Sequence, residues 1–261
     1  MDAREMSSLA DRLIDGRRSR KPIDVAAALA GLSEADAYKL QFAIHDKIAA
    51  SGDRLAGWKV ALTLPAMYEP LKLSGPVFAG VYQSGLRQSG ASFDKGWPIK
   101  PGIEPELVAR IGKDAGPGKT YTADSIRDHV ANLHCGMELV DNRYVDVSKM
   151  SGPARIADNV LQAALVVGTE IKDWHKLDFA GLKGRSVLDG KELASGSGRA
   201  VMGSALISLA WLANRLISHG RHLKAGDLVL TGSVHPPAFL AAKGVARTEF
   251  EGLGSTEITI R

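Results

Sequence analysis

The feature that most constrains this chain is a pair of acidic residues inside an otherwise apolar segment. In "IKPGIEPELVARIG", residues 99 to 112, Glu104 and Glu106 are one residue apart and are flanked by Ile, Leu and Val. In a β-strand alternate side chains share a face, so both carboxylates project to the same side. Two neighbouring carboxylates in a half-buried strand repel each other and resist the loss of water. A fold that contains this strand must therefore supply a compensating charge or leave one face in water.

Hydrophobic periodicity predicts a mixed α/β fold rather than regular β-α-β alternation. The first sixty residues are typical of helices: in "SEADAYKLQFAIHDKIAASG", Ser33 is placed as an N-cap and Gly52 as a helix end. Two more helices are predicted over residues 122–134, capped by Thr122, and over residues 201–220. Short strands are expected in "LAGWKVALT", "PELVARIG", "GMELVD", "ALVVGTEI" and "GDLVLTGS". Many short strands with few helices argue against a doubly wound sheet.

Composition excludes several classes of function. With 261 residues, 45% hydrophobic and 24% charged, the chain has the composition of a globular protein. No apolar run is expected to reach the roughly 18 residues that span a membrane, and the N-terminal residues lack the apolar core of a signal peptide. The single Cys135 excludes an internal disulfide, so a cytoplasmic location is expected. The net charge of +4 comes without an aromatic-interleaved basic stripe, so nucleic-acid binding is not expected.

One segment has the setting of a phosphate-binding loop but lacks its sequence. "KDAGPGKT", residues 113 to 120, lies between a predicted strand and a predicted helix. The first glycine of a P-loop would fall at Lys113, and the loop geometry depends on that glycine. Nucleotide binding is therefore not expected.

The acid pair has two interpretations. On one strand face the Cα atoms of Glu104 and Glu106 lie about 7 Å apart, which suits two carboxylates converging on one divalent cation. Glu138, in "CGMELVD", is a third acid in a similar setting. Three carboxylates without a histidine or thiolate ligand suit a hard ion such as Mg²⁺ or Mn²⁺. The alternative is an edge strand whose glutamates face solvent, and spacing alone favours that alternative.

Several segments taken together resemble the 2-keto-4-pentenoate hydratase and 4-oxalocrotonate decarboxylase family, within the fumarylacetoacetate hydrolase superfamily. They are "DAYKLQ" with "GDRLAGWKVALT", "IEPELV", "GMELVDNRY", "ADNVLQAALVVG", "AWLANRL", and "AGDLVLTGS" with "EFEGLGSTEI". They occur in the family's order and span roughly residues 36 to 260. Singly each segment is weak evidence, but together they are specific for this branch of the superfamily.

The resemblance assigns roles to individual residues. It implies that Glu104, Glu106 and Glu138 are metal ligands for Mg²⁺ or Mn²⁺. It implies catalytic roles for three further residues, which are Lys59 in "GWKV", Asp158 in "ADN" and Ser233 in "TGS". Without the resemblance, Lys59 would be interpreted as a solvated surface residue and Asp158 as part of a turn or cap. A structural role for Asp158 stays an alternative.

The resemblance also implies contacts with the substrate. These are assigned to Thr231 and Gly232 in a glycine-containing turn, to His235 just after it, and to Val77. For His235 a surface loop position is the alternative. Val77 stands where hydratases of the family commonly have an aspartate, and no acid lies between Ser74 and Gln83. Because valine offers neither a carboxyl group nor a hydrogen bond, this departure weakens the hydratase assignment and favours decarboxylation; Val77 lining an apolar pocket is the other possibility.

The expected architecture is a fumarylacetoacetase C-terminal-like rolled, mostly antiparallel sheet with flanking helices. Residues 1–55 are expected to form a helical N-terminal segment and residues 56–261 the catalytic domain. The implied function is that of a divalent-metal-dependent lyase, a hydratase acting on a small 2-hydroxydienoate or 2-oxo-enoate in aromatic meta-cleavage catabolism. The alternatives are a 4-oxalocrotonate-type decarboxylase, an acylpyruvate hydrolase and a non-catalytic paralogue that acts as a binding or scaffold protein. The resemblance also implies a homo-oligomer, with a complex with a related hydratase or decarboxylase as an option, and no membrane partner.

Overall fold

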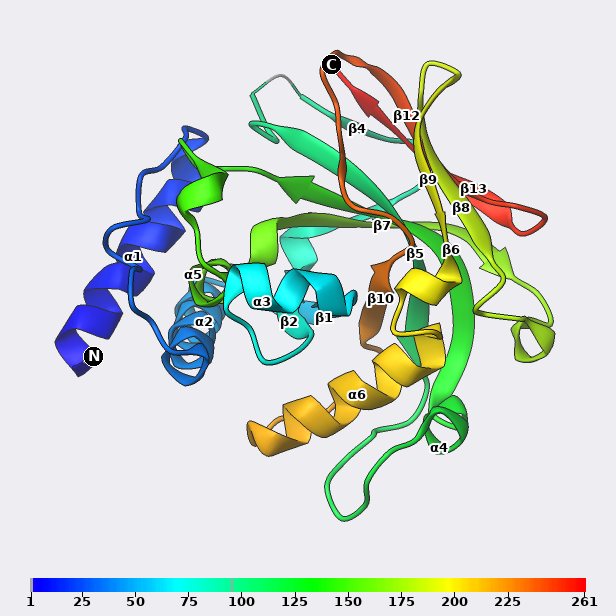
Figure 1. Cartoon of the computed structure of the whole chain (residues 1–261), viewed down its shortest axis with the longest axis horizontal. Helices are drawn as coiled ribbons and strands as arrows, with labels where there is room; N and C mark the ends of the chain where they lie inside the picture. Colours follow the sequence, from blue (N-terminus) through cyan, green and yellow to red (C-terminus); the bar gives the residue numbers. More distant parts are fainter. Residues whose placement is uncertain (1, 95) are drawn as a thin grey trace.

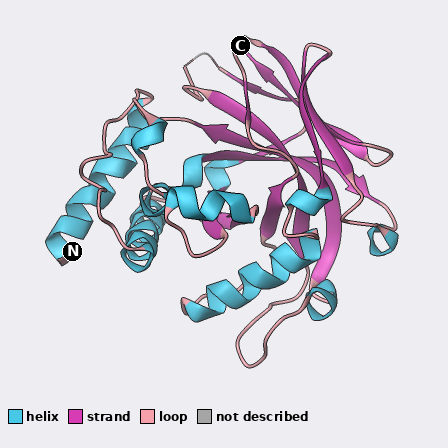
Figure 2. Cartoon of the chain, viewed as in Figure 1, coloured by secondary structure: helices cyan, strands magenta, loops and turns pink. Residues whose placement is uncertain are grey.

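The computed structural model describes residues 2–94 and 96–261; Met1 and Lys95 lie outside the described residues. It contains both helices and strands, coloured separately in Figure 2, with several strands following one another directly along the chain. The α-helices are α1 Ala3–Ser19, α2 Glu34–Ala50, α3 Tyr68–Leu71, α4 Ala123–Arg127, α5 Gly152–Ala157 and α6 Ala205–Ser218. The short 3-10 helices are η1 Pro65–Met67, η2 Gln83–Gly85, η3 Val147–Lys149, η4 Asn159–Leu161, η5 Trp174–Lys176 and η6 Gly198–Ala200.

The strands form two sheets. They are β1 Leu55–Ala61, β2 Val77–Tyr82, β3 Leu86–Gln88, β4 Ala91–Phe93, β5 Pro101–Ile111, β6 Val130–Asp141, β7 Gln162–Ile171, β8 Lys183–Leu188, β9 Lys191–Ser197, β10 Leu228–Ser233, β11 Ala238–Phe239, β12 Gly244–Phe250 and β13 Gly254–Ile260. The larger sheet has the order β2-β1-β10-β5-β6-β7-β3, and β11 also pairs with β5. The smaller sheet has the order β4-β13-β12-β8-β9.

Antiparallel pairing dominates both sheets, as the sequence predicts. Among the described strands, the parallel pairs are β1 with β10, β3 with β7 and β4 with β13. Figure 1 shows α1 and α2 together at one end of the molecule and the smaller sheet at the other, with α6 running below the larger sheet. The predicted mixed α/β fold with a rolled sheet and flanking helices is therefore confirmed. The division of the chain at residue 55 stays a prediction.

The central strands separate a hydrophobic layer from a polar concave face. Ile103 on β5 and Met137 and Leu139 on β6 pack with Ile258 of the smaller sheet in a hydrophobic cluster between the two sheets. Since side chains alternate along a strand, the residues between them face the other way. This alternation directs the glutamates of β5 and β6 away from the hydrophobic layer.

The helix predictions are confirmed in part. Helix α2 begins after Ser33, whose side chain accepts a hydrogen bond from the Asp36 N–H, as expected for an N-cap. The helix predicted over residues 201–220 begins later, at Ala205, because Ser204 supplies the cap. The prediction over residues 122–134 is wrong beyond its first turn, since α4 ends at Arg127. The residues from Val130 onward instead form β6 and pair with β5 and β7.

The expectation about membrane-spanning segments needs a correction. An 18-residue window within Gly198–Ser218 has a mean hydropathy of 1.5, so this segment is long and apolar enough, by length and composition alone, to cross a membrane. Half of that window is buried inside the protein. Leu209, Leu212 and Leu216 on α6 are fully buried in the main hydrophobic core. The segment thus has the packing of a core helix.

Candidate active site

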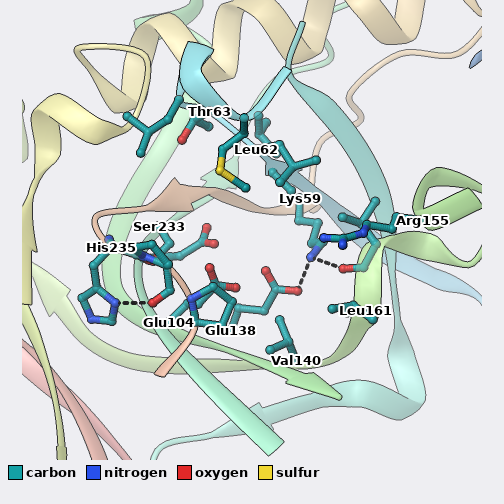
Figure 3. Close-up of a pocket in the computed structure, with 18 residues that line it drawn as sticks. Lys59, Leu62, Thr63, Glu104, Glu138, Val140, Arg155, Leu161, Ser233 and His235 are labelled. Atoms are coloured by element: carbon teal, nitrogen blue, oxygen red, sulfur yellow. Dashed lines mark hydrogen bonds and ion pairs between the residues drawn. The ribbon is translucent and has the colours of Figure 1, made fainter. Parts of the chain in front are cut away.

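A pocket opens on the concave side of the larger sheet, with a volume of about 170 Å³. Its wall is formed by β1 with the segment after it, by the strands β5 and β6, by helix α5 with the η4 turn, and by the end of β10 with the residues after it. Figure 3 shows Ser233 and His235 at one end of this pocket, Lys59 and Arg155 at the other, and Glu104 and Glu138 between them. Its lining comprises Lys59, Val60, Ala61, Leu62, Thr63, Leu64, Met67, Glu104, Glu106, Glu138, Val140, Arg155, Val160, Leu161, Ser233, His235, Pro236 and Pro237.

Three glutamates from two adjacent strands meet in this pocket. Glu104 and Glu106 share one face of β5, and Glu104 lies directly opposite Glu138 in the β5–β6 register. One oxygen from each of the three carboxylates lies within 4.8 Å of the others. Glu106 and Glu138 are each only 1% exposed. The exposed edge-strand alternative is therefore wrong, because β5 lies between β10 and β6 inside the sheet.

The environment opposes ionisation of these carboxyl groups. Burial and the nearby Glu138 raise the pKa of Glu104 to about 8, and Lys59 offsets only part of this effect. Burial and the two other glutamates raise the pKa of Glu106 well above its usual value. Burial also raises the pKa of Glu138, although Lys59 acts in the opposite direction. Ionisation of all three carboxyl groups is therefore unfavourable in the metal-free protein, and a bound cation would make it favourable.

The buried Lys59 makes the closest contact with the cluster. Its Nζ donates to Glu138 Oε1 at 2.5 Å and to the Val160 carbonyl at 2.8 Å. On a flat sheet β1 and β6 would be roughly 14 Å apart, since two other strands lie between them. The contact is possible because the sheet curls, which brings the side chains of β1 and β6 toward each other. The interpretation of Lys59 as a solvated surface residue is wrong, because its side chain is 2% exposed.

Gly232 orients one of the glutamates. Its backbone N–H donates to Glu106 Oε2 at 2.7 Å. Gly232 has a φ of +116°, and a Cβ added there would lie 2.8 Å from Cγ2 of Thr63, so only glycine fits. Thr231 is 1% exposed, and its hydroxyl donates to the Leu107 carbonyl rather than facing the pocket. Neither residue is among those that line the pocket, so their sequence-based assignment as substrate contacts gains no support.

The Val160 carbonyl belongs to a backbone segment in an unusual conformation. Asn159, Val160 and Leu161 have φ values of 59°, 49° and 62°, in the left-handed region that branched side chains rarely adopt. Asn159 holds this segment in place, since its side chain accepts from the Gly80 N–H and donates to the Gly80 carbonyl. The segment brings the Val160 carbonyl to the Lys59 ammonium group and the Leu161 side chain into the pocket wall.

Asp158, just before that segment, is fully buried and faces away from the pocket. Its carboxylate accepts hydrogen bonds from Arg143 Nη2 at 3.0 Å and from the Tyr144 hydroxyl at 2.5 Å. Arg17 of α1 lies at ion-pair distance, 3.4 Å from Asp158 Oδ1. Burial alone opposes ionisation, but Arg143 and Arg17 outweigh it and hold the pKa of Asp158 below its usual value. Asp158 has the contacts of a structural anchor, and it does not line the pocket.

Ser233 and His235 line the pocket at its other end. The Ser233 hydroxyl donates to the His235 carbonyl at 2.6 Å. The His235 ring is almost fully buried, with Nδ1 2.6 Å from the Pro236 carbonyl and Nε2 3.1 Å from Ser186 Oγ. The surface position that was the alternative for His235 is therefore wrong.

Val77 lies outside the pocket. It is fully buried on β2, opposite Ala61 in the β1–β2 register, and belongs to the main hydrophobic core. Its assignment as a substrate contact gains no support from this position. Arg155, Leu62 and Met67 also line the pocket, although nothing in the sequence indicated them. No local pattern distinguishes these residues from surface and core residues, because only the fold brings them to the glutamates.

The three glutamates fit a divalent cation. If all are ionised they carry three negative charges, and Lys59, which forms an ion pair with Glu138, supplies one positive charge. A divalent ion would balance the remaining two charges, and an all-carboxylate donor set suits Mg²⁺ or Mn²⁺. Glu104, Glu106 and Glu138 are therefore the residues of this pocket that can hold such an ion.

Comparison with known proteins identifies the family. Residues 94–261 match the family model described as fumarylacetoacetate (FAA) hydrolase C-terminal. The chain is 32% identical over 257 residues to a 2-keto-4-pentenoate hydratase of Paraburkholderia phymatum, with 97% of both chains covered. It is 28% identical over 224 residues to a 4-oxalocrotonate decarboxylase of Pseudomonas putida, covering 85% of this chain and 83% of that protein.

A solved structure supports the same fold. The structure of 4-oxalocrotonate decarboxylase from Pseudomonas putida G7, complexed with magnesium and adipate, matches with a TM-score of 0.91. The match covers 100% of this chain and 99% of that chain at 23% identity. The family model, the full-length relatives and the shared fold lead to one conclusion. The chain is an enzyme that belongs to the fumarylacetoacetate hydrolase family.

Proposed function

We propose that this enzyme is a divalent-metal-dependent hydratase that acts on a small 2-hydroxydienoate or 2-oxo-enoate, such as 2-keto-4-pentenoate, in aromatic meta-cleavage catabolism. The observation that carries the proposal is the cluster of three buried glutamates beside Lys59 in an otherwise apolar pocket. The full-length similarity to 2-keto-4-pentenoate hydratases supports the same substrate class. Mg²⁺ or Mn²⁺ is the proposed ion, bound by Glu104, Glu106 and Glu138.

The proposed mechanism assigns each group a task. A bound divalent cation supplies positive charge where a 2-oxo acid develops negative charge on its ketone oxygen. Lys59, next to Glu138, can hold or deliver the proton that moves when the dienol ketonises. The apolar wall, which includes Val140 and Leu161, limits water and so strengthens these electrostatic effects. Ser233 offers a hydroxyl group to the substrate or to the water that adds to it.

We infer a positioning role for Asp158 in place of the catalytic role that the resemblance implied. Asp158 is anchored by Arg143, Arg17 and Tyr144 and does not line the pocket. The strained segment that follows it places the Val160 carbonyl against Lys59. Asp158 therefore acts through Val160 and Lys59 rather than on the substrate.

Decarboxylation is the second candidate function. It is favoured by the similarity to 4-oxalocrotonate decarboxylases. The electron pair that remains when CO₂ leaves a vinylogous β-keto acid would pass into the conjugated 2-oxo system, and an ion held by the three glutamates would stabilise the negative charge of the enolate that results. Acylpyruvate hydrolysis and a non-catalytic role as a binding or scaffold protein are the remaining alternatives.

A parallel assay distinguishes these functions. Purified protein with Mg²⁺ or Mn²⁺, with and without EDTA, would be given 2-hydroxypenta-2,4-dienoate, 4-oxalocrotonate and an acylpyruvate, with products identified by mass. A hydratase adds one water to the first substrate, and a decarboxylase releases CO₂ from the second. Hydrolysis of an acylpyruvate with no reaction of either substrate would contradict the lyase proposal. Absence of turnover on all three would favour the non-catalytic alternative.

We also propose that the enzyme is a homo-oligomer, as the family resemblance implies, and that it is cytoplasmic, as expected from its single cysteine. Light scattering after size-exclusion chromatography measures the molar mass directly. A mass equal to one chain of 27.7 kDa at micromolar concentration would contradict the assembly. Mixing with a related hydratase or decarboxylase before chromatography tests for a mixed complex.

A further inference from the structure

A second cavity, with a volume of about 270 Å³, lies between the N-terminal helices and the larger sheet. It is lined by residues of α1 and α2, of η2, and of the strands β2 and β7. Figure 1 shows the two helices together at one end of the molecule. None of the residues that line this cavity lines the pocket of the glutamates, so the two sites are separate.

Four residues that line this cavity have buried polar atoms without a hydrogen bond to the described residues. The atoms are Nε of Arg17, the hydroxyl oxygen of Tyr82, Nε of Arg143 and both amide atoms of Gln162. Tyr82, Arg143 and Gln162 are at most 5% exposed. Because buried polar groups in proteins nearly always have a partner, several such atoms around one cavity indicate a bound molecule that supplies it.

Most of these atoms are hydrogen-bond donors. The Nε atoms of Arg17 and Arg143 and the amide nitrogen of Gln162 can only donate, whereas the amide oxygen of Gln162 can only accept. Burial raises the pKa of Tyr82, so its hydroxyl stays protonated and can donate as well. A molecule that satisfies these groups must therefore be rich in acceptor oxygens, and charge-assisted hydrogen bonds favour an anion.

The charged residues that line the cavity are three arginines and one aspartate. Arg17 and Arg18 lie in the last turn of α1, and Arg143 is the third arginine. The aspartate is Asp53, whose two carboxylate oxygens already accept hydrogen bonds from the backbone N–H and the hydroxyl of Ser84. The wall of the cavity therefore has an excess of positive charge, which attracts anions.

Two further acids near Arg143 do not line the cavity. Asp158 is shared between two guanidinium groups, since Arg143 Nη2 lies 3.0 Å from its Oδ2 and Arg17 Nε lies 3.4 Å from its Oδ1. Asp141 is buried, and its Oδ1 accepts from two backbone N–H groups. In residues 2–94 and 96–261, both arginines thus keep an Nε–H group that forms no hydrogen bond.

The apolar part of the wall indicates which kind of anion fits. Ile14 and Ile48 are buried side chains of α1 and α2, and Trp97 adds an indole ring. An inorganic anion has no apolar surface to place against these side chains. An aliphatic carboxylate directs its oxygen atoms to the donors and removes its hydrocarbon tail from water against the isoleucines.

We propose that this cavity is a second binding site, which takes a small aliphatic monocarboxylate and does not use the metal ion of the glutamates. The carboxylate accepts hydrogen bonds from Tyr82, Gln162 and Arg143, and its tail contacts Ile14 and Ile48. Because the ligand bridges α1 and the larger sheet, it should also raise the melting temperature. The proposal is independent of the proposed function, since the two sites share no residue.

The test compares butanoate with butanamide, which has the same shape but no charge. Calorimetric titrations would use the natural protein with Mg²⁺ and, in parallel, with EDTA. A single butanoate per chain should bind in EDTA, about 10- to 100-fold more tightly than butanamide. Butanoate binding that disappears in EDTA would belong to an ion at the glutamates and would overturn the proposal. Binding of inorganic phosphate but not of butanoate would overturn the assignment to a carboxylate.

Two variants locate the site, and a third is the matched control. Tyr82→Phe and Gln162→Met should each weaken butanoate binding in EDTA about tenfold or more, because each removes a donor to the carboxylate. Tyr121→Phe should bind butanoate like the natural protein. Tyr121 is also a buried tyrosine, but it lies outside the cavity and its hydroxyl donates to the Gly116 carbonyl at 3.0 Å.

Thermal unfolding without ligand separates loss of binding from loss of structure. Tyr82→Phe should melt no lower than the natural protein, because the deleted hydroxyl has no partner among the described residues. Tyr121→Phe should melt at a lower temperature, because it loses a hydrogen bond. Unchanged butanoate affinity in both Tyr82→Phe and Gln162→Met would overturn the proposal.

Discussion

The raised pKa values of the glutamates predict that metal binding releases protons and tightens as the pH rises. Burial and Glu138 raise the pKa of Glu104 to about 8, so at neutral pH this carboxyl group holds a proton that a cation must displace. Below that pKa the ionised fraction falls about tenfold per pH unit. The dissociation constant for Mg²⁺ should therefore be at least about 100-fold weaker at about pH 6 than at about pH 9. The raised pKa of Glu106 can only steepen this dependence.

The same raised pKa of Glu104 determines whether the metal-free protein becomes more or less stable as the pH rises. An acid whose pKa is raised by folding binds its proton more tightly in the folded state. For Glu104 the stability is therefore highest below the ordinary value of 4.5 and falls as the pH rises toward about 8. A bound cation removes this penalty. The rise in melting temperature with saturating Mg²⁺ should thus grow across this pH range.

Calorimetry in two buffers with different heats of protonation counts the protons released. We expect at least about one proton per metal ion at neutral pH. Glu104→Gln should lower that number, whereas Glu257→Gln, which alters a surface ion pair with Arg247, should not. A dissociation constant that does not change with pH, together with no proton release, would refute the reasoning.

Three substitutions test the supporting groups. Lys59→Met should lower kcat by about 10²- to 10⁴-fold without loss of the fold, since Met has similar volume and cannot transfer a proton; an unchanged kcat would exclude Lys59 from the reaction. Asp158→Asn leaves the buried Arg143 without its counter-charge and should lower the free energy of unfolding by about 3–5 kcal/mol in urea titrations. A change below about 1 kcal/mol would mean that the pair contributes no more than a surface one. Gly232→Ala should weaken Mg²⁺ affinity about tenfold or more in calorimetry, because Glu106 loses the N–H that orients it. Wild-type affinity in this variant would show that the contact is dispensable.

The elements that the sequence predicted correctly have strong local signals. Helix α2 has an apolar stripe and a serine cap, so its start at Glu34 follows from adjacent residues. The pair of glutamates on β5 likewise follows from the two-residue period of a strand. The helix predicted through His134 failed for a non-local reason. His134 lies opposite Val108 in the β5–β6 register and opposite Glu170 in the β6–β7 register, and this pairing outweighs the local helical pattern.

The rest of the site depends on contacts between distant segments. Strand β2 was not predicted, because all its residues are buried and it shows no polar alternation. The burial of Lys59 follows from the curl of the sheet, to which its own segment gives no clue. Arg155 is separated from Glu106 by 49 positions, and only the packing of α5 brings it to the same pocket. Such residues become visible only when the chain is folded.

The central claim is that turnover requires one divalent cation held by the three glutamates. The most direct measurement titrates Mg²⁺ into metal-free protein and records bound metal and turnover of 2-hydroxypenta-2,4-dienoate and 4-oxalocrotonate in the same samples. Activity on one of the two substrates should rise in proportion to occupancy and reach its maximum at one ion per chain, and Glu106→Gln should lose both binding and turnover. Full turnover in EDTA, or an active Glu106→Gln variant that binds no metal, would contradict the account.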